Sequence, residues 1–260
     1  MKKVLILGAS GGIGYDIAAE MKQSGYDVFV SSRSLINLSP ILKALALSEG
    51  SSFIADITNK QEQAKIATFV ADNDIDIVIN ASGSNCFSAI EKQSKADIEE
   101  LTQLNLIAPM ELTRDLVEVF KGRGHGTLIH IGSALGAIGL PGYSTYSATK
   151  FGLRGFCQSL ERELADTAID ICYFSPRATD TKLNSYKIIA MNNELGVNSD
   201  SSKLVAHELV KFITTKSSTY QVGWPEKLFV RLNGLMPELV SKSIVKQLPV
   251  YNKYLEKNDG

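Results

Sequence analysis

Two side chains that could carry acid–base chemistry, Tyr146 and Lys150, lie four residues apart in the stretch YSTYSATKFGLRGF, residues 143–156. On a helix, such a pair projects from one face. A free phenol has a pKa of about 10 and is a slow proton donor or base at neutral pH, but a neighbouring ammonium lowers that pKa because it stabilises the phenolate. The spacing therefore predicts a tyrosine that gives or takes a proton. Tyr143 has no lysine four residues later and is expected to line a substrate pocket instead.

A glycine-rich turn directly follows the first apolar run of the chain. The turn reads Gly8-Ala9-Ser10-Gly11-Gly12-Ile13-Gly14 and leads into a helical pattern. Glycines let the backbone approach a pyrophosphate, and the first N–H groups of the helix favour its charge. We expect a dinucleotide to bind here, against Gly8, Ser10, Gly12, Ile13 and Gly14.

The glycine spacing is Gly-x-x-x-Gly-x-Gly, and together with the tyrosine–lysine pair it resembles the short-chain dehydrogenase/reductase family over about residues 3 to 225. Tyr146 and Lys150 resemble the YxxxK motif of that family, and Ser133 stands thirteen residues before Tyr146, at the usual interval. Asn105 falls in the middle of a predicted long helix, and Asn80-Ala81-Ser82-Gly83 resembles the family's NNAG segment.

The resemblance implies a catalytic set of Asn105, Ser133, Tyr146 and Lys150. Tyr146 would be the acid in reduction or the base in oxidation, and Ser133 would hydrogen-bond the substrate carbonyl. Lys150 would lower the pKa of the phenol and hold the ribose of the nicotinamide, and Asn105 would hold a water of a proton relay. The implied cofactor contacts also include Asn80, Ala81, Ser82, Gly83, Tyr146, Lys150, Pro176, Thr179 and Thr181.

The sequence departs from the family pattern at several positions. Leu7 stands where a threonine is frequent, Ala81 replaces the second asparagine of NNAG, and Pro176-Arg177 replaces the common Pro-Gly pair. Arg177 could meet an anionic group of a substrate or point to water.

The residues after the second predicted strand distinguish the two nicotinamide cofactors. An acidic side chain there would bind the ribose hydroxyls of NAD and repel a 2′-phosphate. The sequence has Ser31-Ser32-Arg33-Ser34 instead, so that Ser32 and Arg33 could bind the phosphate of NADP(H), which we expect to be preferred over NAD(H). The alternative for Arg33 is a solvated loop charge. Asp56 and Ile57 are expected at the adenine, although Asp56 or Thr58 could equally cap the next helix.

Seven short apolar runs alternate with amphipathic segments of helical period. The predicted strands are 3–7, 27–31, 52–55, 75–80, 126–131, 169–174 and 219–222, and the predicted helices include 13–24, 60–72, 96–120, 146–166 and 202–215. This alternation favours an α/β fold, a Rossmann-type doubly wound parallel sheet of about seven strands with helices on both faces. We expect one dinucleotide-binding and catalytic domain over residues 1–225.

Two segments should determine the substrate. Residues 182–200 are expected to form a lid with apolar Ile188, Ile189 and Met191, and residues 226–260 to form a C-terminal extension of two amphipathic helices separated at Pro237. The extension could pack on the domain or a partner subunit, cover an apolar substrate, or contact a membrane surface through Lys227, Arg231, Lys242 and Lys246. An apolar lid favours a hydrophobic or acyl-type substrate.

Composition limits the remaining choices. The net charge is −1, which gives no electrostatic case for binding nucleic acid. The three cysteines are widely spaced and the three histidines have no ligand spacing, so we expect a cytoplasmic protein without a metal site. No apolar run approaches the length of about 20 residues that spans a membrane. The expected protein is an NADPH-dependent carbonyl reductase or alcohol dehydrogenase, a homodimer or homotetramer by resemblance. The alternatives are a non-catalytic NADP(H)-binding scaffold and an epimerase or dehydratase relative.

Overall fold

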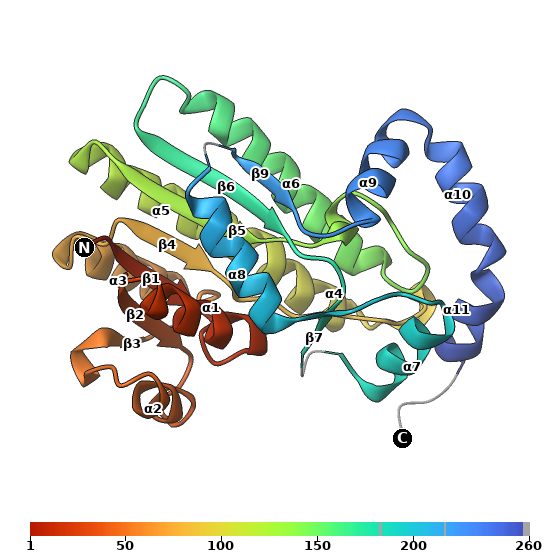
Figure 1. Ribbon diagram of the computed structural model, residues 1–260, viewed down its shortest axis with the longest axis horizontal. Helices are drawn as coiled ribbons and strands as arrows, with labels where there is room; N and C mark the ends of the chain where they lie inside the picture. The colour runs from red at the N-terminus through yellow and green to blue at the C-terminus, as the bar shows by residue number, and fades with distance from the viewer. Residues whose placement is uncertain (182–183, 216, 257–260) are drawn as a thin grey trace.

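A seven-stranded parallel sheet forms the centre of the molecule in a computed structural model that describes residues 1–181, 184–215 and 217–256. Its strand order is β3-β2-β1-β4-β5-β6-β9 (Figure 1). The strands are β1 Lys3–Leu7, β2 Asp27–Ser32, β3 Ser52–Ile54, β4 Ile77–Asn80, β5 Gly126–Ile131, β6 Ile169–Ser175 and β9 Thr219–Gln221. The predicted doubly wound α/β fold is confirmed. Because β1 pairs with both β2 and β4, the chain reverses its winding direction at β1, which is where a crevice opens in such sheets.

Helices cover both faces of the sheet. One face carries α1 Gly12–Gln23, α2 Leu35–Ala44 and α8 Ser202–Ile213, whose buried side chains join one apolar core. The other face carries α3 Lys60–Asp72, α5 Ala108–Arg123 and α6 Ser144–Glu163 around a second core. The central strands read as continuous apolar runs because they are buried on both sides; all four residues of β4 are buried.

Local signals fix the helix ends. Asn59 caps α3, since its side chain accepts hydrogen bonds from the backbone N–H groups of Gln61 and Glu62. The alternative that Asp56 or Thr58 caps this helix is therefore wrong. Gly124 ends α5 in the left-handed conformation at φ 86°, which a glycine adopts without strain.

The predicted long helix over 96–120 is interrupted. It consists of α4 Lys95–Thr102, a π-helical turn Gln103–Ile107 and α5. Ser94 begins α4 with a reciprocal capping box to Asp97. The π turn contains Asn105, and such turns are frequent at functional sites. Short 3₁₀ turns occupy Glu49–Ser51, Ile90–Lys92 and Ala134–Gly136.

The segments beyond β6 cover the carboxyl edge of the sheet. β7 Thr179–Asp180 pairs in parallel with β8 Asp200–Ser201, and α7 Tyr186–Glu194 lies between them in the chain. The predicted lid 182–200 thus contains a helix, while residues 182–183 lie outside the described residues. The extension forms three helices rather than two: α9 Glu226–Leu235, α10 Pro237–Lys246 and α11 Leu248–Leu255. A second break occurs at Leu248 because Pro249 starts a new helix, and residues 257–260 of the predicted extension are not described.

Figure 1 shows α9, α10 and α11 standing at one side of the molecule, beside α7 and away from the amino-terminal strands. Across the described ranges, we find no helix with both the length and the apolar character that crossing a membrane requires.

Candidate active site

The glycine turn lies at the carboxyl end of β1 and folds tightly on itself. Gly8 has φ 77°, and a Cβ added to it would lie 2.8 Å from the backbone nitrogen of Ser82. A Cβ on Gly14 would lie 2.3 Å from the carbonyl oxygen of Gly8. No side chain caps the first turn of α1, which leaves its N–H groups and dipole facing this turn. Ser10 is exposed there, and Gly12 and Ile13 are half-buried. The turn therefore has the space and the polarity that a pyrophosphate requires.

The segment after β4 lies against this turn and is held by a series of buried hydrogen bonds through Asn80, His130 and Thr113. The Asn80 side-chain oxygen accepts from the Ser82 backbone N–H at 3.1 Å. The Thr113 hydroxyl donates to the Pro109 carbonyl at 2.6 Å, so it accepts from His130 Nε2 at 2.9 Å. His130 Nδ1 is then left to accept from the Asn80 amide at 3.4 Å. Burial, followed by the charge of Lys150, lowers the pKa of His130 to about 3, so the ring stays neutral.

Lys150 and Asn105 meet beside Gly83. A Cβ on Gly83 would lie 3.2 Å from Asn105 Oδ1 and 3.6 Å from Lys150 Nζ. Asn105 is fixed by two bonds to the backbone of Ser84, whose N–H donates to Asn105 Oδ1 and whose carbonyl accepts from Nδ2, each at 2.9 Å. Lys150 Nζ donates to the Ile131 carbonyl at 3.1 Å. Burial lowers the pKa of Lys150 to about 8.

Tyr146 lies one helical turn from Lys150, whose Nζ is 5.8 Å from the centre of the phenol ring. Burial raises the pKa of Tyr146, and a hydrogen bond with Ser133 opposes that rise. In the chain alone burial is the largest effect and the net shift is upward, so the lowering of this pKa that we expect from Lys150 stays a prediction. The phenol keeps its proton at neutral pH, as a proton donor must.

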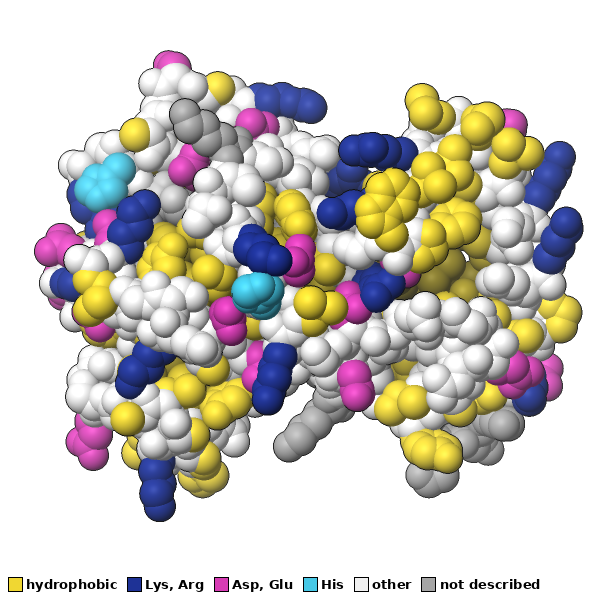
Figure 2. Space-filling view, viewed as in Figure 1, with side chains coloured by type: hydrophobic (Ala, Val, Ile, Leu, Met, Phe, Trp, Pro, Cys, Tyr) yellow, Lys and Arg dark blue, Asp and Glu magenta, His cyan; other side chains and the backbone are white. Residues whose placement is uncertain are grey.

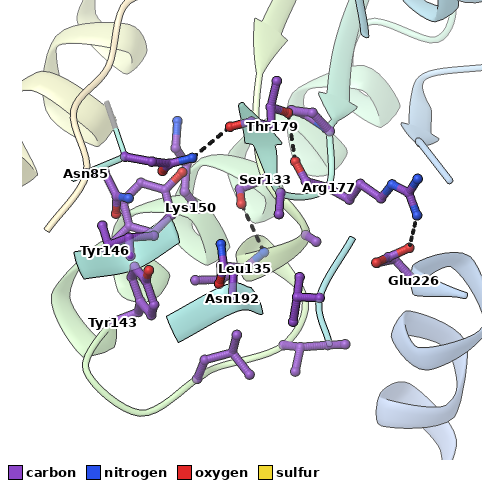
Figure 3. A pocket seen from close by; sticks show the side chains of 18 of the residues that line it. Asn85, Ser133, Leu135, Tyr143, Tyr146, Lys150, Arg177, Thr179, Asn192 and Glu226 are labelled. Carbon is purple, nitrogen blue, oxygen red and sulfur yellow. Dashed lines mark hydrogen bonds and ion pairs between the residues drawn. The ribbon is translucent and has the colours of Figure 1, made fainter. Parts of the chain in front are cut away.

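Ser133 is held by a buried tyrosine that sequence reasoning missed. The Tyr173 hydroxyl accepts from the Ser133 backbone N–H at 3.1 Å and lies 3.3 Å from the carbonyl oxygens of Ser133 and Lys150. A Cβ on Gly132 or Gly136 would collide with the Tyr173 ring or hydroxyl at 2.1 Å. Gly132 and Gly136, on either side of Ser133, were the only features of the sequence that indicated a large side chain packed against this segment. Ser133 Oγ accepts from the Leu135 N–H at 3.1 Å, which leaves its own proton for another acceptor (Figure 3).

Ser133, Tyr146 and Lys150 line a cavity of about 370 Å³, whereas Asn105 and Tyr173 lie behind its lining. Its floor comes from the ends of β4 and β5 and from Tyr143, Tyr146 and Lys150 on or beside α6. Tyr143 is buried, with its ring centre 6.2 Å from that of Tyr146, as expected for a pocket residue. The outer wall is largely apolar and comes from two parts of the chain. The segments beyond β6 contribute Ile188, Met191, Phe229, Val240, Ile244 and Tyr251, and the loop before α6 contributes Ile138 and Leu140. Within the predicted lid, Ile188 and Met191 face inward, whereas Ile189 is exposed.

Arg177 takes neither of the two roles considered for it. Its guanidinium binds both carboxylate oxygens of buried Asp200, at 2.7 and 2.5 Å. It also donates to the Trp224 carbonyl at 2.9 Å and lies 3.4 Å from a carboxylate oxygen of Glu226. Figure 3 shows Arg177 extending away from Ser133 and Tyr146 toward Glu226. Arg177 therefore ties the β7–β8 pair to the start of the C-terminal extension.

The other residues predicted to contact a cofactor fall into two groups. Ala81, Ser82, Gly83, Pro176, Thr179 and Thr181 line the cavity. Thr181 also faces the glycine turn, since its Cβ lies 3.4 Å from the position of a Cβ on Gly12. Thr179 donates to the Arg177 carbonyl at 2.9 Å.

The second group, Ser32, Arg33, Asp56 and Ile57, follows β2 and β3 and lies outside the cavity lining. The Ser32 hydroxyl donates to the Ser34 carbonyl at 2.9 Å, and Arg33 is exposed. Asp56 accepts from the N–H and the hydroxyl of Thr58, at 2.8 and 2.7 Å. Ile57 is buried in the core around α3, so only its backbone could meet an adenine.

Comparison with known proteins agrees with this architecture. The model of the short chain dehydrogenase family matches residues 2–191. The chain is similar to Nodulation protein G of Rhizobium sp. (strain N33), with 29% identity over 229 residues that cover 85% of this chain and 93% of the relative. It is also similar to ketoacyl reductase HetN of Nostoc sp., with 29% identity and coverage of 84% and 77%. A third relative is 3-ketodihydrosphingosine reductase of Dictyostelium discoideum, with 30% identity and coverage of 91% and 79%.

Solved structures share the fold. A short-chain dehydrogenase from Streptomyces avermitilis superimposes with a TM-score of 0.78 at 23% identity, covering 95% of this chain and 97% of that one. A short chain dehydrogenase from Burkholderia cenocepacia, solved in complex with NADP, gives a TM-score of 0.78 at 16% identity, with coverage of 94% and 99%.

Proposed function

This chain belongs to the short-chain dehydrogenase family, and on that premise we propose that it is an NADP(H)-dependent oxidoreductase that reduces a carbonyl of a hydrophobic or acyl-type substrate to an alcohol. The observation that carries the proposal is the convergence of Ser133, Tyr146 and Lys150 on one largely apolar cavity that also reaches Ile13 of the glycine turn. A scaffold that only binds a dinucleotide needs no proton donor at such a place.

Ser133 and Tyr146 have different roles in the proposed reduction. The Ser133 hydroxyl would donate its proton to the carbonyl oxygen of the substrate, while its oxygen accepts from the Leu135 N–H. The hydride that the carbonyl carbon receives would come from a bound nicotinamide. Tyr146 then gives its proton to the oxygen that has gained negative charge, and burial favours its protonated form beforehand. In the reverse direction, Tyr146 takes the proton from the alcohol.

Lys150 and Asn105 support this exchange. Lys150 would hold the ribose hydroxyls of a bound nicotinamide nucleotide. Its Nζ lies 5.8 Å from the centre of the Tyr146 ring, so it would also provide a positive charge near the phenolate after proton transfer. Gly83 and Lys150 line the same cavity, and a side chain at Gly83 would crowd Asn105 Oδ1 at 3.2 Å, so the glycine keeps this part of the cavity clear for a ribose. Asn105 keeps the neighbouring backbone in place through Ser84 and would hold the water that returns a proton toward Lys150.

The preference for NADP(H) rests on the residues after β2. Arg33 is exposed and forms no ion pair with any described residue, so its guanidinium is available for a 2′-phosphate. Ser31 and Ser32 are buried at the end of the strand, and no acidic side chain follows them to accept from ribose hydroxyls. The short chain dehydrogenase from Burkholderia cenocepacia, which shares this fold, was solved in complex with NADP, and this supports the proposal.

The apolar outer wall supports a substrate with a hydrocarbon part. Ile188, Met191, Phe229 and Val240 offer no charge and little hydrogen bonding to a substrate, so they favour a chain over a polar group. The names of two relatives, a ketoacyl reductase and a 3-ketodihydrosphingosine reductase, point to the same class of ketone.

A homo-oligomer, dimer or tetramer, is part of the proposal. Ile107 and Met110 at the start of α5 and Phe151 on α6 are exposed apolar side chains outside the cavity. These helices are the ones that a second copy could cover, and sedimentation of the purified protein would show whether it does.

The proposal is tested by the change in nicotinamide absorbance with the purified wild type. NADPH and NADH are each offered with 3-oxoacyl thioesters and methyl ketones of increasing chain length. We expect turnover with NADPH that rises as the chain lengthens. Faster turnover of small polar ketones would contradict the substrate class, and NADPH binding without turnover of any substrate would favour the scaffold.

A further inference from the structure

The helices α9 and α10, with Trp224 before them, form a projecting element that we call the arm, residues 224–246. Its inner side faces the cavity through Phe229, Val240 and Ile244. Several polar contacts attach it to the body. The Asn233 side chain donates to the Ala137 carbonyl at 2.8 Å, and Arg177 binds Glu226 and the Trp224 carbonyl. Lys227 Nζ lies 4.8 Å from the centre of the Tyr220 ring. No residue of α9 is fully buried, and Val240 is the buried residue of α10.

Several large apolar side chains of the arm are exposed. The exposed fraction is 79% for Leu235, 58% for Leu239 and 59% for Val245. Trp224, Leu228 and Met236 are also exposed. Figure 2 shows hydrophobic side chains gathered over α9 and α10, beside a hollow between the arm and the body. Contiguous apolar surface of this kind marks an interaction site in a folded protein.

Basic side chains accompany the apolar ones. The arm carries Lys227, Arg231, Lys242 and Lys246 against two acidic residues, and one of the acids, Glu226, is already paired with Arg177. The whole chain has a net charge of −1, so the rest of the surface is slightly acidic and the arm is locally positive. Short helices that combine an exposed apolar side with lysine and arginine are typical of segments that lie in a membrane interface.

We infer that the arm docks on an anionic lipid surface, with its apolar side chains in the interface and its lysines and arginine among the headgroups. A second copy of the chain is the competing occupant. A two-fold contact through this surface would bring two arms together, each with four basic and two acidic residues, so the net positive charges would oppose it. A bilayer with anionic lipid satisfies both the apolar and the basic side chains.

Docking of the arm on a membrane would also bring the cavity close to the lipid. Phe229 belongs both to the exposed surface and to the cavity lining, so the docked arm would place the cavity next to the acyl region of the bilayer. A hydrophobic ketone could then pass from the membrane to Tyr146 without crossing water. This consequence rests on the proposed function, whereas the docking itself does not.

The test is flotation of the full-length protein with vesicles of phosphatidylcholine alone and of phosphatidylcholine mixed with phosphatidylglycerol. We expect binding to the anionic vesicles that weakens as salt is raised. The double variant Leu235→Glu/Leu239→Glu should lose this binding, and Lys242→Glu/Lys246→Glu should reduce it about tenfold or more. Ile36→Glu on α2, which is 84% exposed, is the matched control and should bind as the wild type does.

Retention of NADPH binding and an unchanged thermal transition show that each variant is folded. The inference is overturned if the wild type stays unbound to both kinds of vesicle, or if the variant with Leu235→Glu/Leu239→Glu floats as well as the wild type. It is also overturned if sedimentation shows a dimer that these two substitutions dissociate while no vesicle binds, since the occupant is then a second copy. None of these readouts depends on turnover, so failure of the docking and failure of the proposed activity are distinguishable.

Discussion

Replacing Lys150 with Met is expected to abolish turnover and at the same time to stabilise the folded chain in the absence of cofactor. Lys150 is 5% exposed and donates to one carbonyl, that of Ile131. Burial lowers its pKa from 10.5 to about 8, which means that the fold holds the charged ammonium at a cost. Methionine has a similar length and no charge to desolvate.

The size of the effect follows from the pKa. At about 1.4 kcal/mol for each pH unit, the fall from 10.5 to about 8 corresponds to about 3 kcal/mol. The lost hydrogen bond to Ile131 costs about 1 kcal/mol. The Met variant should therefore gain about 2 kcal/mol in free energy of unfolding at pH 7.

The sign of the pH dependence is fixed by linkage. Below the folded pKa of about 8, Lys150 is protonated in both states and the full cost is present. Between about 8 and 10.5, the unfolded chain binds the proton and the folded chain does not, so the stability of the wild type rises with pH. The advantage of the Met variant should shrink across this window.

Urea unfolding of nucleotide-free wild type and Met variant at pH 7 and pH 10 measures the gain in free energy of unfolding and its decrease with pH. Lys43→Met, at an exposed position on α2, is the control and should show no such convergence. A Met variant that is less stable than the wild type at pH 7, or an advantage that is unchanged at pH 10, would refute the reasoning.

Three further substitutions follow from the site. Arg33→Ala should raise the dissociation constant of NADPH about tenfold or more and leave that of NADH within about twofold; equal effects on both would contradict a phosphate contact. Arg177→Gly leaves Asp200 buried without its partner and should lower the free energy of unfolding in urea by about 3 kcal/mol. Adding Asp200→Asn should recover part of this loss. A loss below about 1 kcal/mol would show that the Arg177–Asp200 ion pair contributes little to stability. Tyr173→Phe strands the Ser133 N–H, so we expect a loss of about 1–3 kcal/mol in urea unfolding and a lower kcat; an unchanged kcat would remove its role in positioning Ser133.

The sequence predicted the sheet well because its strands are buried on both sides. Runs such as Val4 to Leu7 are continuously apolar, because no face of the strand is exposed and polar residues need not alternate with apolar ones. Glycine and polar turn residues follow these runs and mark where the strands end. Helix α2 went unpredicted, since Pro40 inside it breaks the expected helical signal. The π turn at Asn105 also lay beyond prediction, because nothing in the local sequence distinguishes it from a continuous helix.

The site was predictable where a motif has short spacing and was missed where partners are distant in the chain. Tyr146 and Lys150 are four residues apart, whereas Arg177 meets residues 23 and 49 positions later. Tyr173 reaches Ser133 across 40 positions, and only the glycines beside Ser133 hinted at it. The rise that burial imposes on the pKa of Tyr146 was not predicted, because burial cannot be read from the spacing of two side chains.

The central claim, that Tyr146 is the proton donor of an NADPH-dependent reduction, is tested most directly by comparing NADPH oxidation by the wild type, Tyr146→Phe and Tyr143→Phe with one long-chain ketone. The account predicts that Tyr146→Phe lowers kcat by about 10²–10⁴-fold while NADPH still binds. Tyr143→Phe removes a hydroxyl from the same cavity and should keep kcat within about tenfold. Near-normal turnover in Tyr146→Phe, or an equal loss in Tyr143→Phe, would contradict the assignment.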